Sequence, residues 1–166
     1  MSLGALNTMS TADAWQTLMQ CCTAERWVEA MVAGRPYVNE QDLCESANRY
    51  WQGLSEEDYL QAFAGHPQIG DIDSLHSKYA NTKALAAGEQ SSVTTADSDV
   101  IKALAQGNRD YLEKFGFIFI VCATGKSAAE MLAMLQQRLS NNRLTELANA
   151  AEQQRNIFQL RLRKLL

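Results

Sequence analysis

The sequence predicts an all-α fold, a single compact helical domain of about eight helices with no sheet. Apolar residues recur at helical spacing along most of the chain, and capping side chains stand where these stretches begin. A length of 166 residues fits one domain, because domains typically contain roughly 100–200 residues. Only residues 117–122, Phe-Ile-Phe-Ile-Val-Cys, have the β-branched and aromatic character of a strand, and no other segment could pair with them. We therefore expect a buried apolar connector there.

Four of the helices are predicted in the first part of the chain, at residues 11–22, 24–33, 39–53 and 55–65. Ser10 or Thr11 can cap the first helix, and Asn39 can cap the third. The tetrapeptide Ser55-Glu56-Glu57-Asp58 resembles a capping box with Asp in the Glu/Gln place, and it opens the fourth. Residues 1–9 lie ahead of these patterns, so we expect a loosely ordered N-terminal extension.

Four more helices are predicted at residues 74–87, 96–114, 127–139 and 145–165. Gly116 ends the second of these. Ser127 and Glu130 form a second capping box, which opens the third. Asn141-Asn142 breaks the pattern before the long final helix. The predicted architecture thus extends to the end of the chain without repeats, linkers or low-complexity segments.

Composition excludes several classes of partner. The net charge is −4, from 15 Lys+Arg and 19 Asp+Glu, whereas a nucleic-acid partner would normally meet a basic face. No apolar run approaches the roughly 18 residues of a membrane span. Residues 1–10 also lack a basic region followed by a hydrophobic one. We expect a soluble, cytoplasmic protein that binds neither nucleic acid nor membrane.

The four cysteines, Cys21, Cys22, Cys44 and Cys122, form no Cys-x-x-Cys pair and have no histidine nearby in the sequence. Zinc ligation is therefore poorly supported. Each cysteine lies in an apolar neighbourhood, which favours buried thiols in a reducing compartment.

The segment Gly65-His66-Pro67-Gln68-Ile69-Gly70 combines one of the two histidines with one of the two prolines. Pro67 fixes its own φ and disfavours helical geometry at His66, so a helix must stop at or before the histidine. A side chain that titrates near neutrality and is held in one orientation is suited to proton transfer. His66 is therefore the first catalytic candidate, and a histidine in an ordinary helix-terminating loop is the alternative.

Further along the chain lie Asp71, Asp73 and His76. These three residues could join His66 in a metal site with mixed nitrogen and oxygen ligands. A structural interpretation competes with this one. Asp73 can cap the following helix, Asp71 can be a solvated turn residue, and His76 can occupy a surface helix position. We favour the structural interpretation and expect no metal.

Two further places carry candidate chemistry. Glu89-Gln90 puts a carboxylate beside an amide, which suits a planar, nitrogen-rich ligand, although a polar helix end is the alternative. Near the C-terminus, Arg161, Arg163 and Lys164 cannot all share one helix face. An arginine turned inward would offer a planar fork to a carboxylate or carbonyl, whereas the others are solvated charges. The residues alone leave both possibilities open.

Several segments, taken in order and spacing, resemble one family. They are His66-Pro67-Gln68-Ile69-Gly70, Glu89-Gln90, residues 117–127 with the helix around Glu130, Glu146, and Leu160-Arg161-Leu162. The family is 2-oxo-4-hydroxy-4-carboxy-5-ureidoimidazoline (OHCU) decarboxylase, the last enzyme of the ureide branch of urate degradation. The resemblance runs from about Ala14 to the C-terminus. It implies an all-α homodimer without metal or organic cofactor, which converts a small-molecule ureidoimidazoline to (S)-allantoin and carbon dioxide.

The resemblance also assigns roles to individual positions. His66 corresponds to the catalytic acid that delivers the proton to one face, and Glu89 corresponds to a second catalytic position. The positions that correspond to substrate contacts are Pro67, Ala86, Gln90, Ile120, Val121, Cys122, Ala123 and Arg161. Two positions depart from the family pattern: Ala86 replaces a serine of many members, and Lys126 replaces an arginine. At residue 86 the hydrogen bond of that hydroxyl is therefore either missing or supplied by water or another group.

Two functions of other classes fit the residues without the resemblance. A non-catalytic helical interaction module explains the helices and the acidic balance, but it leaves the His-Pro and Glu-Gln pairs as accidents. A metal-dependent hydrolase would use His66, Asp71 and His76.

Overall fold

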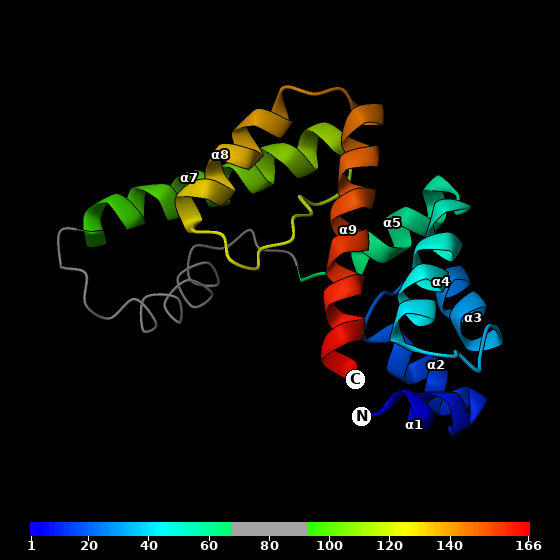
Figure 1. Cartoon of the computed structure of the whole chain (residues 1–166). Helices are drawn as coiled ribbons and strands as arrows, with labels where there is room; N and C mark the ends of the chain where they lie inside the picture. Colours follow the sequence, from blue (N-terminus) through cyan, green and yellow to red (C-terminus); the bar gives the residue numbers. More distant parts are fainter. Residues whose placement is uncertain (68–92) are drawn as a thin grey trace. The chain divides into compact units, whose positions relative to one another are not determined.

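The computed structural model describes residues 1–67 and 93–166, with the backbone alone at 93–97. Within these ranges the chain forms eight α-helices and no strand (Figure 1). Their bounds are α1 Leu3–Thr8, α2 Thr11–Met19, α3 Glu25–Ala33, α4 Glu40–Gln52, α5 Glu56–Ala64, α7 Val93–Phe115, α8 Ala128–Leu139 and α9 Arg143–Leu165. The predicted all-α class is confirmed. The helix predicted at 74–87 lies outside the described residues.

Local capping chemistry fixes where four helices begin. The Ser10 hydroxyl accepts a hydrogen bond from the backbone of the first turn of α2, and the Asn39 side chain does the same at α4. Ser55 and Ser127 form complete capping boxes at α5 and α8. Each N-cap side chain is typically worth about 0.5–2 kcal/mol relative to Ala. All four caps were predicted from the sequence, and all four are confirmed.

Two helix starts differ from the prediction by more than one residue. α7 begins at Val93, ahead of the predicted residue 96. α9 begins at Arg143, because the Asn142 side chain accepts a hydrogen bond from the Thr145 N–H at 2.8 Å. Asn142 therefore starts the last helix as its N-cap instead of only separating it from α8.

The expectation of a loosely ordered extension at residues 1–9 was wrong, because Leu3–Thr8 form α1. Leu6 is fully buried, and the Asn7 side chain exchanges two 2.8 Å hydrogen bonds with the backbone of Tyr37. The Arg35 guanidinium also donates to the carbonyl of Leu6 at 2.7 Å. These tertiary contacts order a helix that six residues could not sustain alone.

Contacts along the backbone divide the chain into two compact units, Met1–His66 with Leu147–Leu166, and Pro67–Glu146. The first four residues of α9 belong to the second of these units, and the remainder belongs to the first. The predicted single domain over residues 1–166 stays a prediction.

The core of the first unit is built on α3, which contacts α2, α4 and α5. Trp27 of α3 is fully buried, and its ring lies 4.9 Å from that of Phe158. Trp51 packs against Phe158 edge-on at 5.5 Å and against Tyr59 at 4.7 Å. Both indole N–H groups are satisfied, by the carbonyls of Ala47 and Ala151. This aromatic cluster fixes the C-terminal part of α9 within the unit.

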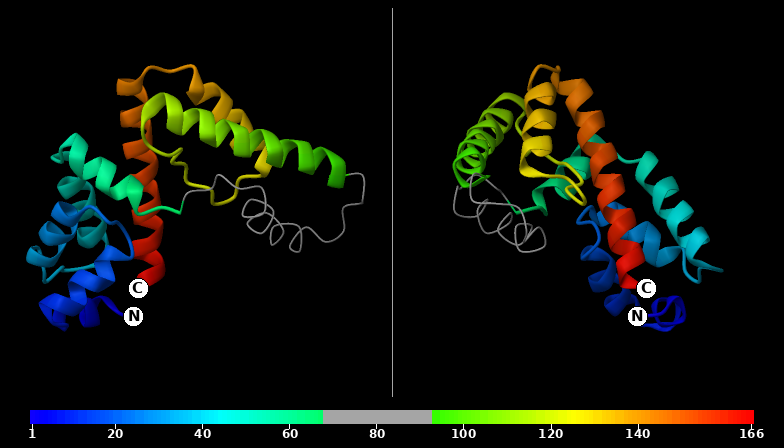
Figure 2. Two further views of the ribbon diagram at one scale, coloured as in Figure 1. Left: turned by 180° about the vertical axis from the view of Figure 1, so that it is seen from behind. Right: turned by 60° about the vertical axis from the view of Figure 1, so that its left-hand side comes forward.

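In the second unit α7 and α8 lie side by side, as both views of Figure 2 show. The helices approach closely at Gly107, where a Cβ atom would stand 2.6 Å from a methyl group of Leu135. The segment after α7 forms no strand, and Phe117 and Ile120 are buried. The prediction of a connector instead of a strand at 117–122 is confirmed, but its predicted burial holds only for these two residues, since the other four are half-buried. No helix of the described ranges is long and apolar enough to cross a membrane.

Candidate active site

His66 stands immediately after α5, as the His-Pro pair predicts. The helix ends at Ala64, Gly65 is its C-cap, and the His66 N–H donates to the Phe63 carbonyl at 3.1 Å. A Cβ atom at residue 65 would meet the Thr23 side chain at 2.1 Å, so only glycine permits this approach. The turn that carries the imidazole therefore packs closely against the side chain of Thr23.

The half-buried imidazole of His66 makes a short contact with α9. Its Nε2 lies 2.5 Å from Oε1 of Gln154, a residue 88 positions away in the sequence. Gln154 is fully buried, and its amide nitrogen has no hydrogen-bond partner among the described residues. The contact ties the imidazole ring to helix α9 and so restricts its orientation.

The segment from Ile120 to Ala123, which is expected to contact substrate through its backbone, is anchored by its carbonyls. Arg138 donates to the Ile120 carbonyl at 2.5 Å, and Lys126 donates to the Cys122 carbonyl at 2.9 Å. Both following peptide bonds are trans, so the N–H groups of Val121 and Ala123 point opposite to these carbonyls. Such an arrangement of N–H donors can hold a carboxylate or a carbonyl oxygen that gains charge.

A glycine with positive φ lies on each side of this segment. Gly116 has φ +79° directly after α7, and Gly125 has φ +75° just before α8. Side-chain-bearing residues rarely adopt this geometry, so both reversals depend on glycine.

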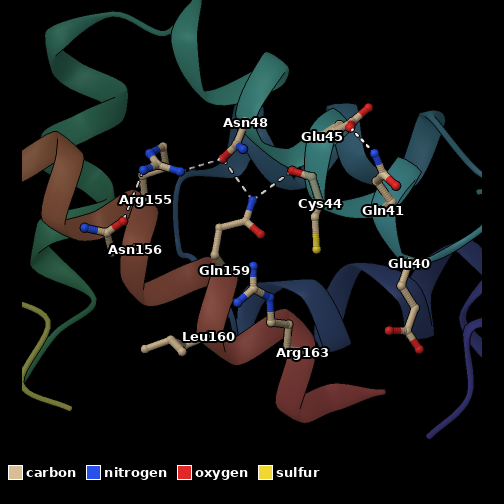
Figure 3. A pocket seen from close by; sticks show the side chains of 10 residues that line it. All are labelled: Glu40, Gln41, Cys44, Glu45, Asn48, Arg155, Asn156, Gln159, Leu160 and Arg163. Carbon is tan, nitrogen blue, oxygen red and sulfur yellow. Dashed lines mark hydrogen bonds between the residues drawn. The ribbon is translucent and has the colours of Figure 1, made fainter. Parts of the chain in front are cut away.

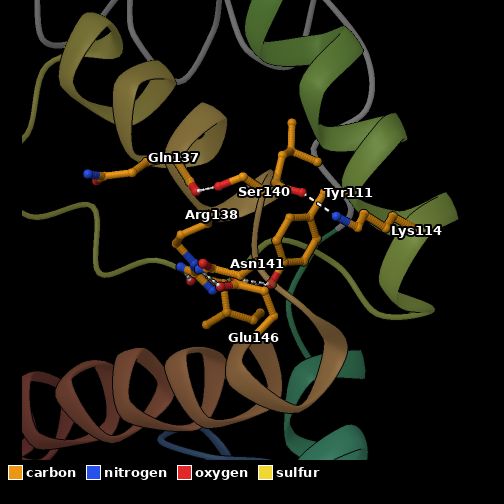
Figure 4. A network of polar contacts seen from close by, with 9 residues as sticks. Tyr111, Lys114, Gln137, Arg138, Ser140, Asn141 and Glu146 are labelled. Atoms are coloured by element: carbon orange, nitrogen blue, oxygen red, sulfur yellow. Dashed lines mark hydrogen bonds and ion pairs between the residues drawn. The ribbon is translucent and has the colours of Figure 1, made fainter.

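A buried polar network holds the Arg138 side chain, which anchors the Ile120 carbonyl, in place. Figure 4 shows this network around Arg138 and Glu146. Glu146 accepts hydrogen bonds at 2.6 Å from both the Arg138 guanidinium and the Tyr111 hydroxyl, and at 2.8 Å from Asn141. The Arg138 guanidinium also lies over the Phe119 ring, 4.7 Å from its centroid. Burial and the bond to Glu146 raise the pKa of Tyr111, so its hydroxyl remains a donor. The Arg138 guanidinium that donates to the Ile120 carbonyl is thus paired with the Glu146 carboxylate.

Arg161 is exposed and donates from Nη1 to the carbonyls of Gln20 and Cys21, each at 3.3 Å. Arg163 and Lys164 are exposed as well, so none of these three cations is buried. Burial raises the pKa of Cys21 to about 11 and that of Cys22 to about 12, and the opposing effect of the Arg161 charge is smaller.

The predicted burial of all four cysteines is correct for two of them. Cys21 and Cys22 are buried, whereas Cys44 and Cys122 are half-buried, and all four are free thiols. The apolar composition of the neighbouring sequence does not reveal this partial exposure.

The structure describes only part of the predicted site. Within the first unit it places His66 and Arg161, and within the second it places Pro67 and residues 120–123. The predicted residues that lie outside the described ranges are Asp71, Asp73, His76, Ala86, Glu89 and Gln90. Sequence reasoning missed Gln154 and Arg138 as supports of the site, because their contacts join distant parts of the chain.

An open groove between α4 and α9, with a volume of about 720 Å³, contains none of the predicted site residues (Figure 3). It is lined by Glu40, Gln41, Cys44, Glu45, Asn48, Arg155, Asn156, Gln159, Leu160 and Arg163. Its polar side chains largely pair with one another, as Gln159 does with Asn48 at 2.9 Å. The described residues also contain no cluster of three His, Cys, Asp or Glu side chains that could hold a metal. The His66 region remains the candidate active site.

Comparison with known proteins decides the family. A family profile described as OHCU decarboxylase matches residues 7–163. The chain belongs to this family. It is 30% identical over 139 residues to the 2-oxo-4-hydroxy-4-carboxy-5-ureidoimidazoline decarboxylase of Amia calva, with 82% of the chain and 78% of that protein covered. The family resemblance inferred from the His-Pro, Glu-Gln and C-terminal motifs is thereby confirmed.

A longer relative and a solved structure agree with this assignment. The chain is 34% identical over 156 residues to the "Uric acid degradation bifunctional protein TTL" of Arabidopsis thaliana. This match covers 92% of the chain but only 46% of that protein. A crystal structure of OHCU decarboxylase in the presence of (S)-allantoin is 34% identical, with a TM-score of 0.70 and coverage of 92% of this chain and 96% of that one.

Proposed function

We propose that this chain catalyses the cofactor-independent decarboxylation of 2-oxo-4-hydroxy-4-carboxy-5-ureidoimidazoline to (S)-allantoin and carbon dioxide in urate degradation. The observation that carries the proposal is the family match over residues 7–163. A second observation supports it: the chain matches a crystal structure of OHCU decarboxylase in the presence of (S)-allantoin, and the match covers 96% of that protein's chain. The reaction class is that of a carboxy-lyase.

In this decarboxylation the protein needs only to bind the substrate and to deliver a proton. Loss of carbon dioxide leaves an electron pair on a ring carbon, and the adjacent imine and carbonyl groups can delocalise it. An additional electron sink is therefore not obligatory. Spontaneous reaction gives both hands of allantoin, so the enzyme's contribution includes protonation from one side.

His66 is the proposed proton donor, since it is held on a glycine-dependent turn at the end of α5. Glu89 and Gln90 are proposed to orient the ureido and ring N–H groups. Arg161 is proposed to stabilise an oxygen that gains charge. The other proposed contacts are Pro67, Ala86, Ile120, Val121, Cys122 and Ala123. The fixed direction of the Val121 and Ala123 N–H groups supports a role as oxygen-binding donors.

The decisive assay is polarimetry of uric acid that is oxidised in situ, with and without the protein. We expect fast appearance of optically active (S)-allantoin with the protein and a slow, racemic product without it. A folded protein that leaves both the rate and the optical rotation unchanged would show that the chain is a non-catalytic helical module.

The metal-dependent hydrolase is tested separately by metal analysis and by chelation. We expect turnover to survive EDTA, because the residues proposed to act require no metal. Loss of turnover with EDTA and its recovery with a divalent cation would favour the hydrolase instead.

We also propose that the protein is cytoplasmic and that it acts as a homodimer, the assembly that the family resemblance implies. Sedimentation equilibrium at several concentrations tests the assembly, with twice the chain mass of 18.4 kDa as the expected result.

A further inference from the structure

The contact between His66 and Gln154 has a defined polarity. The amide oxygen Oε1 of Gln154 faces Nε2 of His66 at 2.5 Å. A carbonyl oxygen can only accept, so the hydrogen must reside on the imidazole Nε2. In neutral imidazole one nitrogen is a donor and the other an acceptor, so this contact selects the Nε2–H tautomer.

We propose that Gln154 is a positioning residue that holds His66 as Nε2–H, so that Nδ1 is the nitrogen that delivers the proton to the substrate. The inference rests on the proposed decarboxylation, and it specifies which atom of the proposed acid acts. The fixed Nε2–H also restricts rotation of the ring, because turning it would break the bond to α9.

The proton balance follows from this assignment. Imidazolium carries hydrogens on both nitrogens, and after carbon dioxide leaves, the electron pair of the broken C–C bond forms a C–H bond with the Nδ1 hydrogen. The imidazole that remains is neutral and already the Nε2–H tautomer. Gln154 therefore keeps its hydrogen bond through the step, and Nδ1 regains a proton from water for the next turnover.

The burial of Gln154 supports a role beyond packing. The residue is fully buried, yet its amide nitrogen has no partner in the described ranges. A buried donor left unpaired destabilises the folded chain, and a leucine at this position would avoid that cost. The gain that offsets this cost is the hydrogen bond from Oε1 to His66.

The first test is spectroscopic. Because the chain has only two histidines, a His76→Gln background labelled with ¹⁵N-histidine leaves His66 as the one imidazole observed. We expect the ¹⁵N shifts of neutral His66 to show protonated Nε2 and unprotonated Nδ1. Gln154→Leu should give a mixture of tautomers, and Gln154→Glu, which keeps an acceptor oxygen, should restore Nε2–H.

The second test is kinetic. Gln154→Leu should lower kcat by roughly 10- to 100-fold, the range seen when a metal-bound histidine loses its orienting partner, with little change in KM. Gln154→Glu should recover most of this loss. Gln159→Leu is the matched control, since it removes another buried amide from α9, one that bonds to Cys44 and Asn48. It should change stability but leave the His66 spectrum and kcat as in the parent.

The outcomes separate the two proposals. A parent protein without stereospecific turnover overturns the proposed function, whichever tautomer the spectra show. A parent that turns over substrate but carries neutral His66 as Nδ1–H overturns the inference about Gln154 alone. The same holds if Gln154→Leu retains the kcat and the His66 spectrum of the parent.

Discussion

The Tyr111 hydroxyl donates a 2.6 Å hydrogen bond to Glu146, 35 residues further along the chain. Both side chains are fully buried, and the same carboxylate oxygen accepts from Arg138. A buried carboxylate is tolerated only when it is paired and hydrogen-bonded, and both conditions are met here. The relationship therefore links the interior of α7 to the first turn of α9 and, through Arg138, to the Ile120 carbonyl.

Replacing Glu146 should destabilise the protein strongly. Glu146→Leu leaves the Arg138 charge buried without its partner, for which we expect a loss of about 3–5 kcal/mol in the free energy of unfolding. Tyr111→Phe removes the hydrogen bond donated to Glu146 and the 3.3 Å hydrogen bond accepted from Arg138, but no charge, so it should cost only about 1–2 kcal/mol. Urea unfolding followed by far-UV circular dichroism measures both. Equal losses in the two variants would contradict a charge-dominated network.

Replacing His66 should abolish most activity without unfolding the chain. The side chain is half-buried at a helix end, so its loss should leave the fold intact. Positioned acids and bases typically increase the rate about 10²–10⁴-fold. His66→Ala and His66→Asn should therefore show native circular dichroism and a rate reduced by a factor in that range. Near-parental turnover in the folded variants would rule out His66 as the proton donor.

Glu89 is predicted to act with His66, and its replacement should change the pH dependence of the rate. Glu89→Gln keeps the shape but removes a negative charge that favours imidazolium. Turnover should fall, and the step in the pH–rate profile that reports the acid should move to lower pH. Glu89→Ala should lose more, since it also leaves a substrate N–H unpaired. A Glu89→Gln variant with the parental rate and profile would make Glu89 a bystander.

Asp71, Asp73 and His76 are predicted to be dispensable for catalysis. Substitution of each with Asn or Ala should remove at most a helix cap, a loss of about 1–2 kcal/mol. Turnover at saturating substrate and thermal unfolding check the two effects. Activity abolished in these variants and restored by added divalent cation would support the metal site instead.

The four thiols should fall into two classes of reactivity. Because burial raises the pKa of Cys21 to about 11 and of Cys22 to about 12, almost no thiolate exists at pH 8. The half-buried Cys44 and Cys122 should react first with Ellman's reagent, and the other two only after denaturation. A Cys44→Ser, Cys122→Ser double variant should lose the fast phase. Rapid modification of Cys21 in that variant would contradict the buried assignment.

Features set by neighbouring residues could be predicted from the sequence. The caps at Ser10, Asn39, Ser55 and Ser127 depend on side chains and backbone within one turn, and all four are confirmed. The connector at 117–122 was predictable because a lone strand has no partner.

Features set by distant contacts could not be predicted. Helix α1 depends on the hydrogen bonds between Asn7 and Tyr37, and six residues carry too little periodicity to reveal it. The partnership of Gln154 with His66 joins residues 88 positions apart, so no local pattern encodes it. The expected substrate contacts at 120–123 came from family resemblance, since an apolar connector gives no sign that its carbonyls are anchored.

All three tryptophans, Trp15, Trp27 and Trp51, stand within Met1–His66, and the unit formed by Pro67–Glu146 contains none. Intrinsic indole emission is thus a reporter confined to one unit, whereas ellipticity at 222 nm sums over every helix. A chain that melts as one cooperative body gives superimposable curves from the two signals. Two separate midpoints would instead reveal a pair of independently melting bodies joined through α9. The distribution of three indoles therefore makes folding cooperativity measurable without introducing any label.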